Sequence, residues 1–324
     1  MQILITGAAG FIGFNLAHEL LKSKNKLKVY GIDNMSNYYS VNLKKKRLKM
    51  LKKFKNFKFS KISLDNTVKL KKYFSNKNFD YIFHFAAQAG VLYSIKNPRA
   101  YLNSNTKGFF NLLENSKNKK IKTIFYASSS SVYGNSKKFP LKEDQIIKPI
   151  NFYGLTKKNN EETAEIFSHF YKINLVGLRF FTVFGEWGRP DMVFHKLFLS
   201  AFKKKIFQLN NKGNHLRDFT YIGDVVKVLI NLMNLKKIKQ KKHIIFNICS
   251  NKPVKLTSLI HILNLKGIKI KLKMAPLQLA DIIKTHGCNK KLLKNFKNFK
   301  FTPFEKAFDK TINWYQKNIN ITLK

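Results

Sequence analysis

Tyr153 and Lys157 stand four residues apart in the segment 151–157, downstream of a run of serines from Ser128 to Ser131. On a helix, positions i and i+4 share a face, so the two side chains would lie next to each other. A lysine ammonium beside a tyrosine phenol lowers the pKa of the phenol, which makes a phenolate available near neutral pH. An ordinary helix surface also carries such pairs, so the rest of the chain decides whether this pair does chemistry.

A glycine loop follows the first apolar run of the chain, with the spacing Gly-x-x-Gly-x-x-Gly. Glycines at these positions permit a tight turn, let the backbone approach a pyrophosphate and allow a helix to pack closely on a strand. The N–H groups and the dipole of the helix that follows attract the anion. We therefore predict a dinucleotide site at Gly7, Gly10, Phe11, Ile12 and Gly13.

Asp33 ends the second apolar run, 20 residues after Gly13. A carboxylate at this place accepts hydrogen bonds from the ribose diol of an adenosine and repels a 2′-phosphate. The next residue is Asn34 rather than a basic one, so the sequence favours NAD over NADP as the cofactor. The alternative for Asp33 is a strand-end turn former.

The elements that would position these residues alternate between strand-length apolar runs and amphipathic stretches. This rhythm predicts an α/β fold with a doubly wound parallel sheet of the Rossmann type. We expect an NAD-binding domain over 1–180 and a smaller C-terminal α/β substrate-binding domain over 181–324. A strand near 243–248 would return to the main sheet, while the Lys- and Asn-rich segments 44–58 and 234–243 read as solvated helix faces and loops. The runs predicted as strands of the first domain are 2–5, 28–32, 81–85, 123–127 and 174–179.

Composition sets further limits on the class of protein. The 324 residues are 44% hydrophobic, as in a globular protein, and carry a formal net charge of +45. Only five of the 62 basic residues are arginines, and the charge is spread along the chain. Nucleic-acid surfaces favour arginine because its fork binds phosphates and guanine edges bidentately, so nucleic acid is not expected as a partner. A polyanion-binding protein with a degenerate dinucleotide fold stays the alternative outside the enzymes.

Membrane and metal sites are not expected. No apolar run reaches the length of about 18 residues that a membrane-spanning helix needs. The two cysteines have no metal-ligand spacing, and the first residues run into a strand without a basic leader. These features predict a cytoplasmic protein without a bound metal.

The glycine loop and Asp33, taken with the segment 84–88, Asn105, Ser129 and the Tyr153–Lys157 pair, resemble the extended short-chain dehydrogenases/reductases. The resemblance covers residues 1 to about 315. It implies that Tyr153, Lys157 and Ser129 are catalytic. It also implies further contacts to NAD from Asp65, Ala86, Ala87, Gln88, Asn105, Tyr153 and Lys157.

Four segments are more narrowly similar to the UDP-glucuronate 4-epimerases, namely 31–39, 127–134, 179–192 and 217–222. In these enzymes NAD⁺ takes a hydride from C4 of the sugar, and the 4-ketose turns over in the pocket and receives the same hydride on its other face. By this resemblance Tyr153 is the base and then the acid. Lys157 lowers the pKa of Tyr153 and holds the nicotinamide ribose, and Ser129 shares the proton of the substrate hydroxyl.

The residues after Ser129 bear on the choice of substrate. Related dehydratases carry an Asp-Glu pair where this chain has Ser130 and Ser131, and two hydroxyls donate to a sugar carboxylate that two carboxylates would repel. By the resemblance, Thr182 adds a hydroxyl to this carboxylate site where UDP-galactose 4-epimerases have Asn. Arg189 holds the carboxylate or a closing loop, and the alternative is that it only braces Asp191.

The resemblance also assigns substrate contacts away from the carboxylate. Arg217 would bind the UDP diphosphate, and Gln278 and Asp281 match a UDP-sugar segment of the substrate domain. The leading prediction is epimerisation of UDP-glucuronate to UDP-galacturonate with NAD. A neutral UDP-hexose or UDP-N-acetylhexosamine is the alternative substrate. Relatives generally pair two helices per subunit, so we expect a homodimer formed through 103–116 and 153–171.

Overall fold

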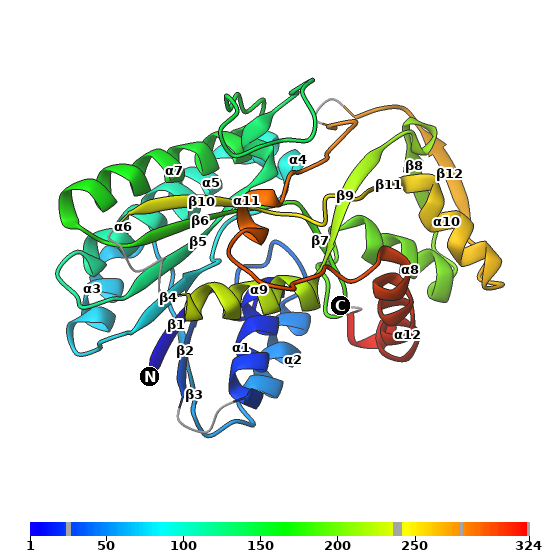
Figure 1. Ribbon diagram of the computed structural model, residues 1–324. Helices are drawn as coiled ribbons and strands as arrows, with labels where there is room; N and C mark the ends of the chain where they lie inside the picture. The colour runs from blue at the N-terminus through cyan, green and yellow to red at the C-terminus, as the bar shows by residue number, and fades with distance from the viewer. Residues whose placement is uncertain (24–26, 236–241, 279–280, 323–324) are drawn as a thin grey trace.

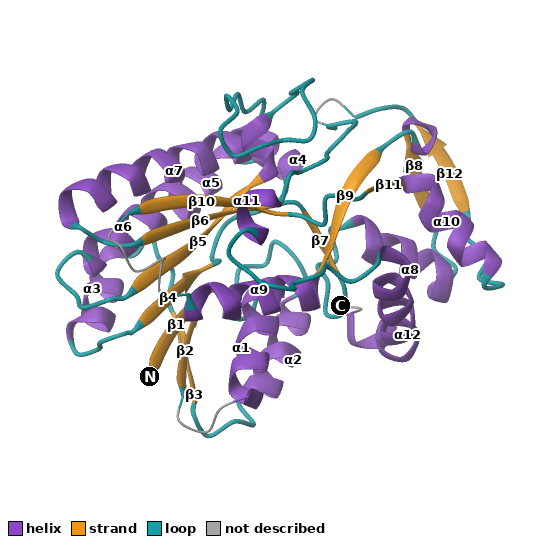
Figure 2. Cartoon of the chain, in the orientation of Figure 1, coloured by secondary structure: helices purple, strands orange, loops and turns teal. Residues whose placement is uncertain are grey.

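We describe the protein from a computed structural model, which covers residues 1–23, 27–235, 242–278 and 281–322. Its largest element is a seven-stranded parallel sheet with the order β10-β6-β5-β4-β1-β2-β3 (Figures 1 and 2). The chain starts at β1, winds outward to β3, and then crosses back to continue from β4 to β10. This reversal places a ligand crevice at the carboxyl ends of β1 and β4. The predicted doubly wound α/β fold is confirmed.

The strands of this sheet are mostly apolar runs because helices cover both faces. Six of them match the predicted strands to within two residues. The sequence did not predict β3, which lies at the edge of the sheet. Phe57 is buried in this strand while Lys58 and Lys61 are exposed, and the lysines made the segment look like a loop. The strands are β1 (Gln2–Thr6), β2 (Lys28–Asp33), β3 (Phe57–Lys61), β4 (Tyr81–His84), β5 (Thr123–Ser129), β6 (Leu175–Phe180) and β10 (His243–Ile248).

Helices pack on both faces of the sheet (Figure 1). One face is covered by α1 (Phe11–Ser23), α2 (Val41–Leu51) and α9 (Ile222–Asn234). The other face is covered by α3 (Thr67–Ser75), α6 (Gly108–Ser116) and α7 (Phe152–Tyr171). Each face has its own apolar core, with Phe14 and Leu229 in the first and Phe109 and Ala164 in the second.

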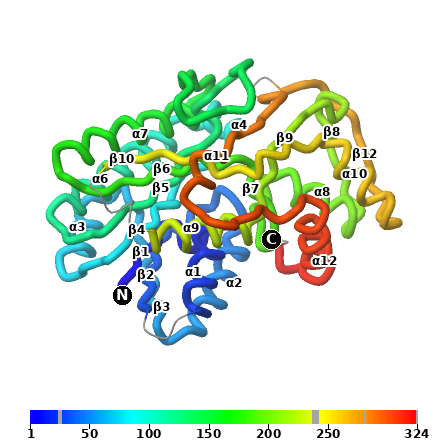
Figure 3. Tube along the Cα trace, in the orientation of Figure 1, coloured from blue at the N-terminus to red at the C-terminus, as the bar shows by residue number. Residues whose placement is uncertain are grey.

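The second half of the chain contributes to both parts of the molecule. β10 pairs in parallel with β6, and α9 packs on α1 (Figure 3). The remaining elements surround a third core and form two small sheets, β11-β9-β7 and β12-β8. The boundary at residue 180 stays a prediction. These elements are β7 (Thr182–Phe184), α8 (Val193–Lys203), β8 (Phe207–Asn210), β9 (Leu216–Tyr221), β11 (Pro253–Lys255), α10 (Leu256–Leu265), β12 (Leu272–Ala275) and α12 (Phe304–Thr322).

Short helical segments connect these layers. They are α4 (Val91–Lys96), α5 (Pro98–Tyr101), the π-helix η1 (Leu102–Lys107), the 3₁₀ helices η2 (Ser130–Tyr133) and η3 (Asn211–Gly213), and α11 (Lys290–Leu293). Among the residues that the structure describes, no helix has the length and apolar character needed to cross a membrane. The same residues contain no cluster of His, Cys, Asp and Glu side chains that would hold a metal ion.

Candidate active site

Ser129, Tyr153 and Lys157 come together where β5 ends and α7 begins. Asn151 caps α7, and its side-chain oxygen accepts a hydrogen bond from the N–H of Gly154 at 2.8 Å, which fixes the first turn of the helix. Ser129 and Tyr153 are joined by a side-chain hydrogen bond. The Nζ atom of Lys157 lies 5.9 Å from the centre of the Tyr153 ring. The helical i, i+4 pair and its serine partner are therefore present as one cluster.

The electrostatics of this cluster differ from the sequence expectation in one respect. Burial raises the pKa of Tyr153, whereas the hydrogen bond with Ser129 and the charge of Arg189 lower it. The Lys157 ammonium donates to the carbonyl oxygen of Ala127 at 2.7 Å. The sequence predicts that Lys157 lowers the pKa of the Tyr153 phenol. In the structure, Ser129 and Arg189 are the residues that lower it. Burial lowers the pKa of Lys157 itself to about 8, against the opposing charge of Glu161.

Glu161 is a neighbour of the cluster that sequence reasoning missed. It accepts hydrogen bonds from Nε of Arg179 at 2.9 Å and from Nη2 at 2.8 Å, and Ser128 donates to it as well. This buried pair ties α7 to β6 and β5 beneath the catalytic cluster. The available signal was the spacing, because Glu161 lies four residues after Lys157 on the same face of the helix.

The glycine loop fits a dinucleotide because its glycines leave no room for side chains. A Cβ atom on Gly13 would lie 2.3 Å from the carbonyl oxygen of Gly7, and one on Gly7 would lie 2.7 Å from the nitrogen of Ala86. The Asp33 side chain lies against the loop, since its Oδ2 accepts a hydrogen bond from the N–H of Ala9 at 3.1 Å. The backbone of the loop, the start of α1 and the Asp33 carboxylate thus form the cradle that a pyrophosphate and an adenosine ribose require.

The predicted cofactor contacts after β4 are held by protein hydrogen bonds. Asn105 accepts from the N–H of Gln88 at 2.7 Å, and its Nδ2 donates to the Gln88 carbonyl and to Oγ1 of Thr156, each at 3.0 Å. Asn105 is therefore engaged in holding the segment that includes Ala86, Ala87 and Gln88 against α7. Asp65 lies in the loop after β3, where the Ser63 hydroxyl donates to it.

Residues of the predicted carboxylate site lie at the same sheet edge. Ser129 pairs in register with Phe180, and Ser131 and Thr182 each follow two residues later, just beyond the carboxyl ends of the neighbouring strands β5 and β6. Ser131 donates its N–H to Oγ of Ser129 at 3.1 Å, and Ser130 is partly exposed at the start of η2.

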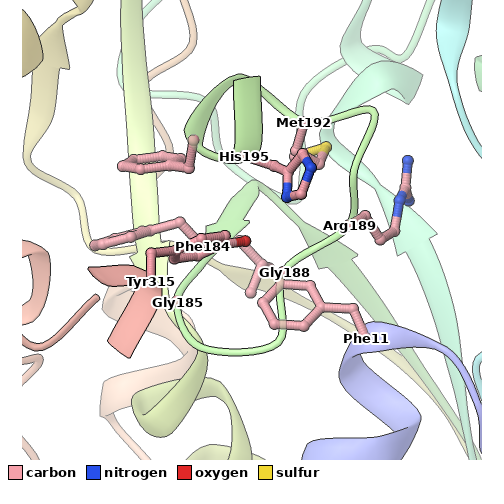
Figure 4. A pocket seen from close by; sticks show the side chains of 10 residues that line it. Phe11, Phe184, Gly185, Gly188, Arg189, Met192, His195 and Tyr315 are labelled. Atoms are coloured by element: carbon pink, nitrogen blue, oxygen red, sulfur yellow. The ribbon is translucent and has the colours of Figure 1, made fainter. Parts of the chain in front are cut away.

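Arg189 lies in the segment between β7 and α8. Its Nε donates to Oδ1 of Asp191 at 2.9 Å and its Nη2 donates to Oδ2, so it does brace Asp191. The charge of Arg189 lowers the pKa of Tyr153, and the charge of its partner Asp191 raises it. Figure 4 shows a small cavity behind this segment, lined by Phe11 and Tyr315 among others, with the Arg189 guanidinium directed away from both rings.

A second polar group lies on the small sheets. Nη1 of Arg217 donates to the carbonyl oxygen of Ile283 at 2.8 Å, and burial lowers the pKa of Arg217 to about 10, against the charge of Asp281. The N–H of Asp281 donates to the carbonyl oxygen of Gln278 at 3.0 Å. Arg217 belongs to β9, and Gln278 and Asp281 lie in the segment after β12.

Comparisons with known proteins agree on a family. A model described as the NAD dependent epimerase/dehydratase family matches residues 3–249. UDP-glucuronate 4-epimerase 2 of Arabidopsis thaliana is 36% identical, over 97% of this chain and 76% of its own length. The UDP-glucuronic acid 4-epimerase of Bacillus cereus, solved with UDP-glucuronic acid and NAD, has a TM-score of 0.91 at 28% identity, covering 98% of this chain and 99% of that chain.

A further neighbour is the UDP-glucose 4-epimerase of Thermotoga maritima, solved with UDP-glucose. Its TM-score is 0.87 at 25% identity, and the match covers 98% of this chain and 100% of that chain. The glycine cradle and the Ser129–Tyr153–Lys157 cluster indicate the same family as these matches. The chain belongs to the NAD dependent epimerase/dehydratase family and is an NAD-dependent nucleotide-sugar epimerase.

Proposed function

We propose that this enzyme interconverts UDP-glucuronate and UDP-galacturonate by inverting C4 of the sugar. The observation that carries the proposal is Arg189 itself, a charged side chain on the segment between β7 and α8 that pairs with Asp191 and whose charge lowers the pKa of Tyr153. A guanidinium within electrostatic reach of the proposed base suits a substrate whose carboxylate, on C5, neighbours the carbon that reacts. Glucuronate has this arrangement, whereas a neutral hexose offers the arginine no charge.

In this proposal the protein side chains move one proton. Tyr153, as the phenolate, takes the proton of the C4 hydroxyl and later returns it, and the Ser129 hydroxyl shares that proton through its hydrogen bond to Tyr153. Lys157 keeps a positive charge next to the phenol and faces the nicotinamide ribose. Bound NAD would supply the hydride acceptor at C4 and return the same hydride to the opposite face, so the net redox change would be zero.

The remaining predicted residues supply binding. Ser130, Ser131 and Thr182 contribute hydroxyls to the carboxylate, and the group of Arg217, Gln278 and Asp281 holds the UDP moiety. Elimination of water is disfavoured because Ser130 and Ser131 provide neither a carboxylic acid nor a carboxylate base. The residues proposed to bind NAD are Gly7, Gly10, Phe11, Ile12, Gly13, Asp33, Asn34, Asp65, Ala86, Ala87, Gln88, Asn105, Tyr153 and Lys157.

A neutral UDP-hexose, or its N-acetyl derivative, is the second candidate substrate. It is favoured by the contact between Arg189 and Asp191, because an arginine that already has a carboxylate partner has less need of a second one. The two candidates differ in the role of Arg189: UDP-glucuronate needs it to bind the sugar carboxylate, and a neutral sugar does not.

The substitution Arg189→Ala separates the two substrates. We expect kcat/KM for UDP-glucuronate to fall by about 10- to 10²-fold, since a charge-assisted hydrogen bond contributes about 1.5–3 kcal/mol. The value for UDP-glucose should change much less. Steady-state kinetics with both sugars checks this, and an equal loss for the two would reject the carboxylate role.

A further inference from the structure

Arg47 is a buried cation of α2 whose contacts reach both sides of the crevice. Its side chain is 0% exposed. Nη1 donates to the carbonyl oxygen of Ala9 at 2.9 Å, while Nη2 donates to those of Trp187 at 2.5 Å and Gly188 at 3.3 Å. Ala9 belongs to the glycine loop, and Trp187 and Gly188 directly precede Arg189. One guanidinium therefore joins the cofactor loop to the segment that carries the carboxylate-binding arginine.

The segment after β2 makes two further links to the same region. The Tyr39 hydroxyl accepts from Nη1 of Arg47 at 3.0 Å, and the Tyr39 ring lies 5.7 Å from the centre of the guanidinium. The neighbouring Tyr38 donates its hydroxyl to Oδ2 of Asp191 at 3.2 Å, and Asp191 is the partner of Arg189. The 186–192 segment is thus held from the cofactor half of the molecule at two points.

Stability alone does not account for a buried arginine at this place. Among the residues that the structure describes, Arg47 forms no ion pair, and its hydrogen-bond partners are three carbonyl oxygens and a phenol. Burying a charge without a counter-charge costs free energy, and apolar residues of similar volume often serve stability as well. What an apolar residue cannot do is hold two loops by their carbonyl groups in one fixed geometry.

We propose that Arg47 is a positioning residue that couples the NAD loop to the carboxylate-binding segment. The proposal rests on the proposed function in assigning Arg189 to the sugar carboxylate. NAD bound on the glycine loop would fix the position of Ala9. Arg47, bonded to the carbonyl of Ala9, would then fix the carbonyls of Trp187 and Gly188, and so the position of the following residue, Arg189. Coupling of this kind is reciprocal, so each ligand tightens the binding of the other by the same factor.

The test combines Arg47→Met, which keeps the length of the side chain but removes its donors, with Arg189→Ala in a double-mutant cycle. We expect Arg47→Met to weaken NAD binding roughly tenfold and to raise KM for UDP-glucuronate roughly tenfold, with kcat at saturation nearly unchanged. KM for UDP-glucose should rise much less. In the Arg189→Ala background, adding Arg47→Met should raise KM for UDP-glucuronate by less than about threefold.

Several results would overturn the proposal. If Arg47→Met raises KM for both sugars equally, or by the same factor with and without Arg189, Arg47 has only a general structural role. Arg47→Lys is the second variant in case Arg47→Met fails to fold, because it keeps the charge while one ammonium cannot replace the fork across both loops. If Arg47→Lys binds NAD and UDP-glucuronate as the wild type does, the proposal is wrong.

The two proposals can fail separately. Wild-type enzyme that does not convert UDP-glucuronate would refute the proposed function. The effect of Arg47→Met on NAD affinity, measured by titration without any sugar, still decides whether Arg47 organises the cofactor loop. Unchanged NAD affinity in a folded Arg47→Met variant would refute the coupling even if UDP-glucuronate is the substrate.

Discussion

At the scale of single residues, the pKa of Tyr153, the proposed base, is under opposing influences. Burial raises the pKa of Tyr153, and Ser129 and Arg189 lower it. A base must be deprotonated to act, so the rate should rise with pH through the pKa of Tyr153 in the holoenzyme. Ser129 is then more than a proton partner, because its hydrogen bond sets part of the pH range in which the enzyme works.

Ser129→Ala should move this pH dependence. Removing a hydrogen bond that lowers the pKa leaves the pKa higher, so the rising limb of kcat against pH shifts to more alkaline pH. A typical hydrogen bond contributes about 1 kcal/mol, and one pKa unit corresponds to about 1.4 kcal/mol, so the shift should be below about one unit. A pH–rate profile measures it, with Ser75→Ala on the exposed end of α3 as the control. An unmoved limb in Ser129→Ala would contradict the account.

The residues that sequence reasoning found and missed differ in how they act. Tyr153 and Lys157 lie four residues apart on one helix, and this spacing places them on the same face, so the pair could be predicted from the sequence. Arg47 acts through carbonyl groups 38 and 140 residues away, which any residue type provides. Such contacts leave no pattern in the sequence. For Arg189 the sequence allows two roles, holding the sugar carboxylate or bracing Asp191, and the structure contains the Asp191 contact that the second role requires.

At the scale of elements, α7 carries Tyr153 and Lys157 on one face and exposed apolar residues on another. Ile166 and Phe170 are 56% and 68% exposed, and Phe110 of the adjacent α6 is 45% exposed. Apolar side chains gathered on two neighbouring helices are typical of an interface. We propose that a second copy of the chain covers them, in line with the pairing of two helices per subunit expected from the sequence.

Phe170→Glu tests this pairing. A charge placed at the centre of an apolar interface must be desolvated without a partner, so we expect the variant to be monomeric. Size-exclusion chromatography with light scattering gives the mass of the wild type and the variant. Val68→Glu on α3, at a side chain 78% exposed, is the matched control and should stay a dimer. A monomeric wild type, or a Phe170→Glu dimer as stable as the wild type, would refute the proposal.

The elements themselves were largely predictable because buried parallel strands are apolar runs bounded by turn residues. The exceptions follow from position in the sheet and in the chain. β3 lies at an edge and carries exposed lysines, which hid its period. α9 returns to the first face of the large sheet from the second half of the chain, and only tertiary contacts show on which half a helix packs.

At the scale of the whole molecule, the fold brings the glycine loop after β1 and the Ser129, Tyr153 and Lys157 cluster to the carboxyl ends of the parallel strands. The net charge of +45 comes mostly from lysines spread over the chain and would attract any anionic ligand, including a nucleotide-sugar. The assignment to an enzyme family leaves the polyanion-binding alternative with no support beyond this charge. The central claim is that the assembled site inverts C4 of UDP-glucuronate.

That claim is tested most directly by proton NMR of the purified enzyme with NAD and UDP-glucuronate in D₂O. We expect UDP-galacturonate to accumulate until the two sugars reach equilibrium, with protium retained at C4 because the same hydride leaves and returns. Tyr153→Phe, loaded with NAD, should bind the sugar and show no conversion. No conversion by the wild type, or deuterium appearing at C4 of the product, would contradict the account.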